Sequence, residues 1–175
     1  MILTPAGVAE VHCANAASRI CVLSEDLGKQ KTFSIVDPVR GRLELAKLDT
    51  PGVLMTQWSL FPDGSKMALM GDQSDNVNVR VFDLRSKQAQ VIHPTPPQKL
   101  FQKLAWSADG KRIFLSGIAE NGSGRLLEMD LSGNTHLLLK NLMGWISAPV
   151  PPPDGKRFAY IYLVLESNVT LLEHF

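Results

Sequence analysis

Short blocks of apolar residues alternate with polar turns along the whole chain, and this pattern predicts β-strands. The blocks are rich in Val, Ile, Phe and Leu, whereas the spacing that buries one face of an amphipathic helix is nearly absent. In the middle of the chain, strands are expected at residues 100–106, 112–117, 125–130 and 135–139. The preceding stretch predicts four more at residues 54–58, 67–70, 78–84 and 89–93. The expected fold is therefore all-β, built from groups of four antiparallel strands.

One tight-turn signal recurs along the chain with a period of about 46 residues. The three copies are Asp63-Gly64, Asp109-Gly110 and Asp154-Gly155. We expect each pair to form the turn between the first and second strands of a group, because Gly tolerates positive φ and Asp can cap its own backbone. A period of about 40 to 50 residues made of short strands is typical of the blade of a β-propeller.

A Trp-Ser pair precedes two of these turns. Trp58 and Trp106 are expected to end the first strand in equivalent positions of two blades. Repeated aromatic side chains could line a ligand-binding face, but packing between neighbouring blades is the favoured interpretation. A weaker copy lies upstream, where residues 13–20 align without a gap with residues 106–113. That copy lacks the Asp-Gly pair and must turn in another way.

The period divides the 175 residues into a single propeller domain of four blades. The expected blades span about residues 8–50, 51–96, 97–142 and 143–175, with residues 1–5 as a closing strand. The last blade has a third strand at residues 167–173 but no fourth, and an unpaired strand edge invites pairing. Either the N-terminal strand closes a four-bladed ring within the chain, or two chains form an eight-bladed ring as a homodimer. The homodimer is favoured because it keeps ordinary angles between blades.

Composition and charge narrow the classes of function. The formal net charge is +1 and no long run of Lys or Arg occurs, so no nucleic-acid partner is expected. No apolar stretch reaches the roughly 18 to 20 residues that span a bilayer, and the N-terminus lacks the features of a signal peptide. The localisation stays open: cytoplasmic for a free chain, and periplasmic if the chain belongs to a membrane-tethered regulator.

No catalytic, metal-binding or cofactor motif is present, so neither an enzyme nor a bound cofactor is expected. The four histidines lack the spacing of metal ligands, and no nucleophile elbow occurs. Asp63, Asp109 and Asp154 could form a ring of carboxylates, but their place before Gly favours a turn role. Cys13 and Cys21 fall on adjacent strands, which allows a cross-strand contact, although two buried free thiols are the favoured interpretation.

The third blade carries a recognisable sequence. Residues 106–113 (Trp-Ser-Ala-Asp-Gly-Lys-Arg-Ile) and 126–133 (Leu-Leu-Glu-Met-Asp-Leu-Ser-Gly) resemble the TolB-like, WD40-related PD40 repeat of β-propellers. The resemblance covers residues 54–140 well, and residues 9–50 and 143–175 more weakly. The ending of the chain is similar to propellers found C-terminal in bacterial Ser/Thr kinase or winged-helix regulators. Such a resemblance implies interaction or sensing and names no particular ligand.

The favoured function is a non-catalytic module that binds a protein or senses a small ligand, as the C-terminal part of a bacterial signalling regulator. Its binding faces would consist of the turns between first and second strands and the loops between second and third strands. Two alternatives stay open. The chain could be a structural remnant without independent activity or, least favoured, a propeller hydrolase or lyase with its site at the central channel.

Overall fold

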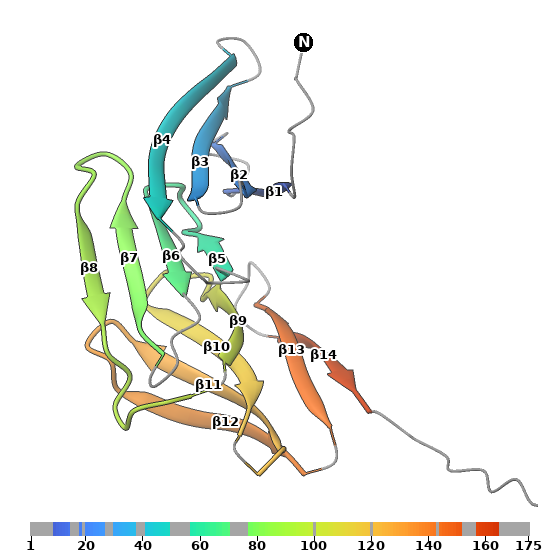
Figure 1. Ribbon diagram of the computed structural model, residues 1–175. Helices are drawn as coiled ribbons and strands as arrows, with labels where there is room; N and C mark the ends of the chain where they lie inside the picture. Colours follow the sequence, from blue (N-terminus) through green and yellow to red (C-terminus); the bar gives the residue numbers. More distant parts are fainter. Residues whose placement is uncertain are drawn as a thin grey trace, which may run out of the picture.

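The computed structural model consists of β-strands joined by turns, with no helix among the residues that it describes (Figure 1). The described residues are 9–14, 18, 20–26, 30–37, 41–49, 57–70, 77–99, 101–119, 121–142, 144–151 and 157–164. Within them, the strands form three four-stranded antiparallel sheets and one two-stranded sheet. The predicted all-β propeller with four-stranded antiparallel blades is confirmed.

Each four-stranded sheet is one blade, and its strands follow one another in chain order. The first blade consists of β1 (Ala9–Cys13), β2 (Cys21–Asp26), β3 (Gln30–Asp37) and β4 (Gly41–Asp49). The second consists of β5 (Gln57–Leu60), β6 (Lys66–Met70), β7 (Val79–Asp83) and β8 (Ala89–Ile92). The third consists of β9 (Phe101–Trp106), β10 (Arg112–Ile118), β11 (Gly124–Asp130) and β12 (Thr135–Asn141). The described strands of the fourth blade are β13 (Trp145–Val150) and β14 (Ala159–Leu163).

Three predicted features of the chain lie outside the described residues. They are the closing strand at residues 1–5, the turn at Asp154-Gly155 and the third strand of the fourth blade at residues 167–173. These features stay predictions.

The first strand of the second blade differs from its prediction. It was expected to end at Trp58, but β5 continues to Leu60. Leu60 pairs with Met67 in the second blade as Trp106 pairs with Ile113 in the third. Leu60 is therefore the equivalent of Trp106, and the prediction that the two tryptophans occupy equivalent positions is wrong. Trp58 lies two residues earlier along its strand and still points to the same side of the sheet.

The first turn of the first blade also differs from its prediction. The backbone N–H of Ala14 donates to the carbonyl of Ile20 at 2.8 Å, whereas the corresponding bond of the third blade runs from Ser107 to Arg112 at 2.9 Å. The turn without Asp-Gly is therefore one residue longer than its counterpart. The gap-free alignment of residues 13–20 with residues 106–113 is wrong by one position after the turn.

The hydrophobic core lies between the blades. Along β6, Met67 and Leu69 join a buried cluster with the first blade, whereas Ala68 and Met70 join a cluster with the third. Strand β10 divides its side chains in the same way between the second and fourth blades. This alternation follows from the two-residue period of a strand. Apolar contacts on both faces of β6 and β10 therefore hold neighbouring blades together.

Candidate functional site

The first strand of each blade lies beside the first strand of the next blade. Strand β5 contacts β9, β9 contacts β13, and β1 contacts β5. Figure 1 shows these strands towards the middle of the molecule, with the later strands of each blade farther out, so that the blades follow an arc. The four inner strands and their turns line a hollow of about 290 Å³, which we call the inner hollow.

Apolar and proline side chains make up most of the inner hollow. The first two blades contribute His12, Cys13, Ala14, Ser59, Leu60 and Pro62. The other two contribute Leu104, Ala105, Trp106, Ala108, Pro149, Val150 and Pro151. Ala14, Pro62 and Ala108 belong to turns between first and second strands, so the inner hollow lies at the end of the blades that carries these turns. A concave, mainly apolar surface with few polar groups is typical of a binding site.

Trp58 connects the second blade to the first. Its side chain is buried, stacks on the His12 ring with centroids 4.1 Å apart, and meets the Phe33 ring edge-on at 5.4 Å. Its Nε1 donates a hydrogen bond of 2.9 Å to Oε2 of Glu10. Three side chains of the first blade therefore hold this tryptophan, and its place is between blades.

Trp106 lies in the corresponding way between the second and third blades. Its Nε1 donates to the backbone carbonyl of Ser59 at 3.2 Å, and its ring meets the Phe61 ring edge-on at 4.8 Å. Unlike Trp58, it also lines the inner hollow. Trp106 therefore belongs both to the packing between blades and to the candidate binding surface, two roles that the sequence pattern presented as alternatives.

His12 is the ionisable side chain of the inner hollow. Burial disfavours the charged imidazolium and lowers the pKa of His12 below 6.5. The Glu10 carboxylate opposes this effect, and the cations Lys103 and Lys31 reinforce it. His12 is thus mainly neutral at pH 7, which leaves the described lining of the inner hollow without a charged group.

The Asp-Gly turns pack against the preceding blade. Gly64 has a φ of 78° and Gly110 a φ of 68°. A Cβ atom added at Gly110 would lie 2.1 Å from Cζ of Phe61, and one added at Gly64 would lie 3.2 Å from Cβ of Ala14. Positive φ and close approach therefore both require glycine at these turns. Sequence reasoning missed the contact between blades, because nothing in the sequence marks Phe61 as the neighbour of Gly110.

Each aspartate of these turns caps its own turn. Asp63 Oδ1 accepts a hydrogen bond of 2.7 Å from the backbone N–H of Ser65. Asp109 Oδ1 accepts bonds from Ser107 Oγ at 2.7 Å and from the backbone N–H of Lys111 at 3.1 Å. These two bonds hold the pKa of Asp109 below its usual 3.8. Both carboxylates therefore act within their own turns.

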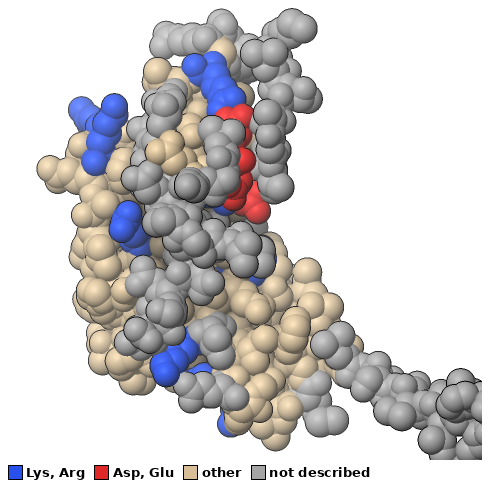
Figure 2. Space-filling view, in the orientation of Figure 1, with Lys and Arg blue, Asp and Glu red and all other residues tan. Residues whose placement is uncertain are grey.

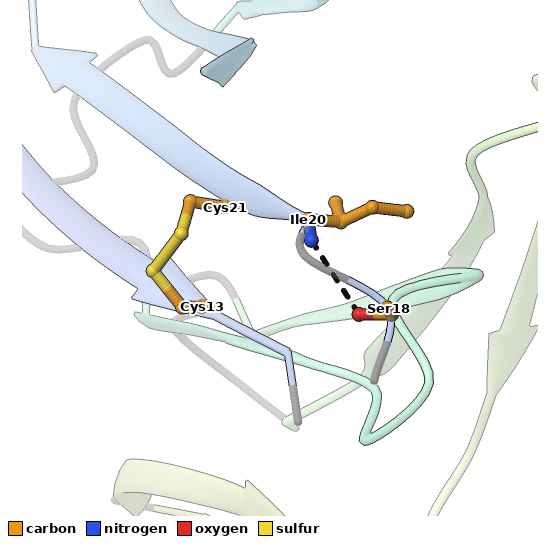
Figure 3. The surroundings of a disulfide bond; sticks show 4 residues. All are labelled: Cys13, Ser18, Ile20 and Cys21. Atoms are coloured by element: carbon orange, nitrogen blue, oxygen red, sulfur yellow. Dashed lines mark hydrogen bonds between the residues drawn. A yellow bond between two sulfur atoms is a disulfide. The ribbon is translucent and has the colours of Figure 1, made fainter. Parts of the chain in front are cut away.

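Cys13 and Cys21 form a disulfide bond (Figure 3). Cys13 is also one of the residues that line the inner hollow. The two cysteines stand directly opposite each other on β1 and β2, with Cα atoms 4.0 Å apart. Beside them, the backbone N–H of Ile20 donates to Ser18 Oγ at 3.5 Å. The prediction of two buried free thiols is wrong, whereas the cross-strand contact that their placement allowed is present. The longer first turn brings the two cysteines into register.

No group of three or more His, Cys, Asp or Glu side chains in the described part of the chain could hold a metal ion. The same residues contain no helix that is long and apolar enough to cross a membrane. On the face drawn in Figure 2, acidic side chains gather over the first blade and basic side chains lie apart from one another. The described residues of that face form no basic stripe of the kind that binds nucleic acid.

Solved structures share this architecture. TolB from Acinetobacter baumannii matches 95% of this chain with a TM-score of 0.66 and 17% sequence identity. A chain in the crystal structure of a nidogen–laminin complex matches 85% of it with a TM-score of 0.64 and 8% identity. The fold is that of a TolB-like β-propeller.

The likeness to these structures is one of fold. No protein-family model and no curated protein matches the sequence. The chain spans 41% of the TolB chain and 54% of the chain from the nidogen–laminin complex. Kuenenia stuttgartiensis hydrazine synthase matches 91% of this chain over 57% of its own, with a TM-score of 0.51 and 16% identity. A protein named as a synthase thus shares the fold with one from a protein–protein complex, so the fold alone does not decide the function.

Proposed function

We propose that this TolB-like propeller is a non-catalytic protein-interaction module that binds a partner at the inner hollow. The observation that carries the proposal is the hollow itself, which all four blades line with mainly apolar and proline residues. The similar chain from the nidogen–laminin complex supports it, because that structure is a complex between proteins. Apolar concave surfaces of this kind receive the anchor side chains of partner proteins.

The size of the inner hollow suits one or two anchor side chains of a partner. Its volume of about 290 Å³ lies at the lower end of the range for small-molecule pockets. Val150, at its edge, is 57% exposed and is available for apolar contact. Pro62, Pro149 and Pro151 stiffen the surrounding backbone, which lowers the entropy lost when a partner binds.

We also propose that the module is part of a larger signalling protein and that it pairs with a second copy of itself. The resemblance of residues 167–175 to the ends of bacterial regulators supports a place as the C-terminal part of such a signalling protein. Exposed apolar side chains on the two end blades support pairing with a second copy. On the first blade this is Val11, and on the fourth these are Ile161 and Leu163.

Site-specific photo-crosslinking tests the binding face. Ala108, a lining residue of the inner hollow, is replaced by p-benzoylphenylalanine, and the protein is irradiated in an extract of its source cells. The matched control carries the same residue at Gln90, which is exposed on the outer strand of the second blade. We expect a discrete adduct from position 108, absent from position 90, that is lost when excess unlabelled protein competes. An absence of adducts at 108, or the same adducts at both positions, would contradict the proposal.

A further inference from the structure

A second and larger hollow lies beside the third blade. Its volume is about 580 Å³, within the usual range for small-molecule sites, and it shares no lining residue with the inner hollow. We call it the linker hollow, because residues 96–99 of the connection between the second and third blades form one wall. The opposite wall consists of the loop after β10 and the strands β11 and β12, which contribute Ala119, Asn121, Ser123, Arg125, Leu137 and Lys140.

The linker wall is fixed at both ends before any ligand binds. The backbone N–H of Thr95 donates to the Gly133 carbonyl at 2.7 Å, and the N–H of Thr135 donates to the Thr95 carbonyl at 3.1 Å. At the other end, the N–H of Val77 donates to the Gln98 carbonyl at 2.8 Å. A wall held in this way loses little conformational entropy on binding.

Two positive charges face each other across the floor of the linker hollow. Arg125 of β11 and Lys140 of β12 are directly opposed partners in the antiparallel pairing, and both line the hollow. Like charges directly opposite each other on neighbouring strands repel and destabilise a sheet. Among the described residues that line the hollow, none is an acid that could offset them. An anion bound between the two side chains would remove the repulsion.

The Arg125 guanidinium gives a second, independent indication. Its Nε is buried and has no hydrogen-bond partner among the residues that the structure describes. A buried donor without a partner is costly, and a missing partner of this kind is often an ion or a water. Arg125 as a whole is only half-buried and lines the hollow, and its planar guanidinium suits a bound carboxylate or phosphate.

The remaining lining indicates what else the ligand carries. Pro96, Pro97, Ala119 and Leu137 supply apolar surface, and the Leu137 side chain is 46% exposed. Lys99 of the linker wall adds a third cation to the lining, so that cations and apolar surface together fit a molecule with an anionic group on an apolar body. Figure 2 shows basic and no acidic side chains among the described residues drawn at the lower end of that face, where the third blade lies.

We propose that the linker hollow is a binding site for a small anionic ligand, whose carboxylate or phosphate sits between Arg125 and Lys140. The apolar part of the ligand rests on Pro96, Pro97 and Leu137. This site is independent of the inner hollow, so the module can hold a protein partner and a small ligand at the same time.

Titration of the whole chain with inorganic phosphate and with benzoate tests the proposal, with sodium chloride at matched ionic strength as the blank. The readout is the 15N–1H signal of the Arg125 Nε–H group, assigned by its loss in R125Q, together with the rise in melting temperature. We expect a saturable shift of that signal with at least one of the two anions, and a saturable rise in melting temperature. A stronger response to phosphate or to benzoate identifies which anionic group the ligand carries.

Three variants separate the site from a general effect of charge. R125Q and K140Q each remove one of the two facing cations, and R85Q removes an exposed cation from the turn after β7. We expect R125Q and K140Q to weaken binding at least about tenfold, and R85Q to bind like the wild type. K140Q alters an exposed residue and decides the question alone if R125Q does not fold. The absence of a saturable response to both anions, or full binding by K140Q, would overturn the proposal.

Discussion

Gly110 shows how two physical demands can meet at one residue. Its φ of 68° lies in the left-handed region, which costs energy for any residue with a Cβ atom. The Phe61 ring of the preceding blade also fills the space that a Cβ would need. Gly122 has a similar φ of 79°, but no described residue lies within 4 Å of a Cβ atom added there. The two positions therefore separate the cost of the backbone conformation from the cost of the contact.

We predict that Gly110→Ala destabilises the protein more than Gly122→Ala. The substitution at Gly122 should cost about 1 kcal/mol of unfolding free energy, because only the positive φ is strained. The substitution at Gly110 should cost roughly 1 to 3 kcal/mol more, because Phe61 must also move. Chemical denaturation of both variants gives the two values.

The same glycine substitution in a Phe61→Ala variant shows whether Phe61 causes the larger loss of stability at Gly110. In Phe61→Ala, the extra cost of Gly110→Ala should disappear and leave only the backbone cost, since residues in contact couple in a double-mutant cycle. Equal costs for Gly110→Ala and Gly122→Ala in the wild-type background would show that the turns do not pack against the preceding blade as described.

At the scale of single elements, the strands of the third blade could be read from the sequence. Alternating apolar residues and turn signals place its four strands within two residues of their observed limits. The same two-residue period explains the error at Trp58. A shift of two residues along a strand returns every side chain to the same face. The apolar pattern therefore cannot decide whether Trp58 or Leu60 occupies the position equivalent to that of Trp106.

The candidate site was less accessible to sequence reasoning. The disulfide depends on a single extra residue in the first turn, which no Asp-Gly pair marks. In the gap-free alignment, Cys13 would face Ile20, whereas the longer turn places it opposite Cys21. Likewise, the inner hollow is formed by side chains from four blades, and only the packing of blades brings them together.

The disulfide lies on the side of the first blade that faces away from the second blade. Cys13 and Cys21 occupy the positions that Trp106 and Ile113 hold in the third blade, where these residues pack on the preceding blade. Val22, next to Cys21, packs on the second blade, so the disulfide faces the other side. In the first blade, the disulfide thus occupies the positions through which the third blade packs on the second blade.

We predict that reduction destabilises the wild-type protein and leaves the Cys13→Ser/Cys21→Ser variant unchanged. The disulfide closes a loop with a sequence separation of 8, for which chain-entropy arguments give about 2.5 kcal/mol. Melting curves of oxidised protein with and without dithiothreitol measure the effect. Two free thiols in the unfolded, unreduced protein, or identical wild-type curves, would contradict the assignment.

At the scale of the whole molecule, the described blades form an arc with two end faces. Inside the arc, neighbouring blades cover each other with apolar clusters. At its ends, the exposed fraction of Val11 on β1 is 56%, and that of Ile161 on β14 is 52%. Apolar surface on both end blades is the arrangement that a second copy can cover head to tail, which would give the eight-bladed ring with two-fold symmetry.

The central claim is that a second copy of this chain completes the ring of blades. The mass of the purified chain in solution tests this claim most directly. We expect twice the chain mass of 19.2 kDa at micromolar concentration. Ile161→Glu places a charge on the fourth blade and should release the monomer. Leu138 on the third blade is 43% exposed, and Leu138→Glu should leave the dimer intact. A wild-type mass of 19.2 kDa at that concentration would contradict the eight-bladed assembly.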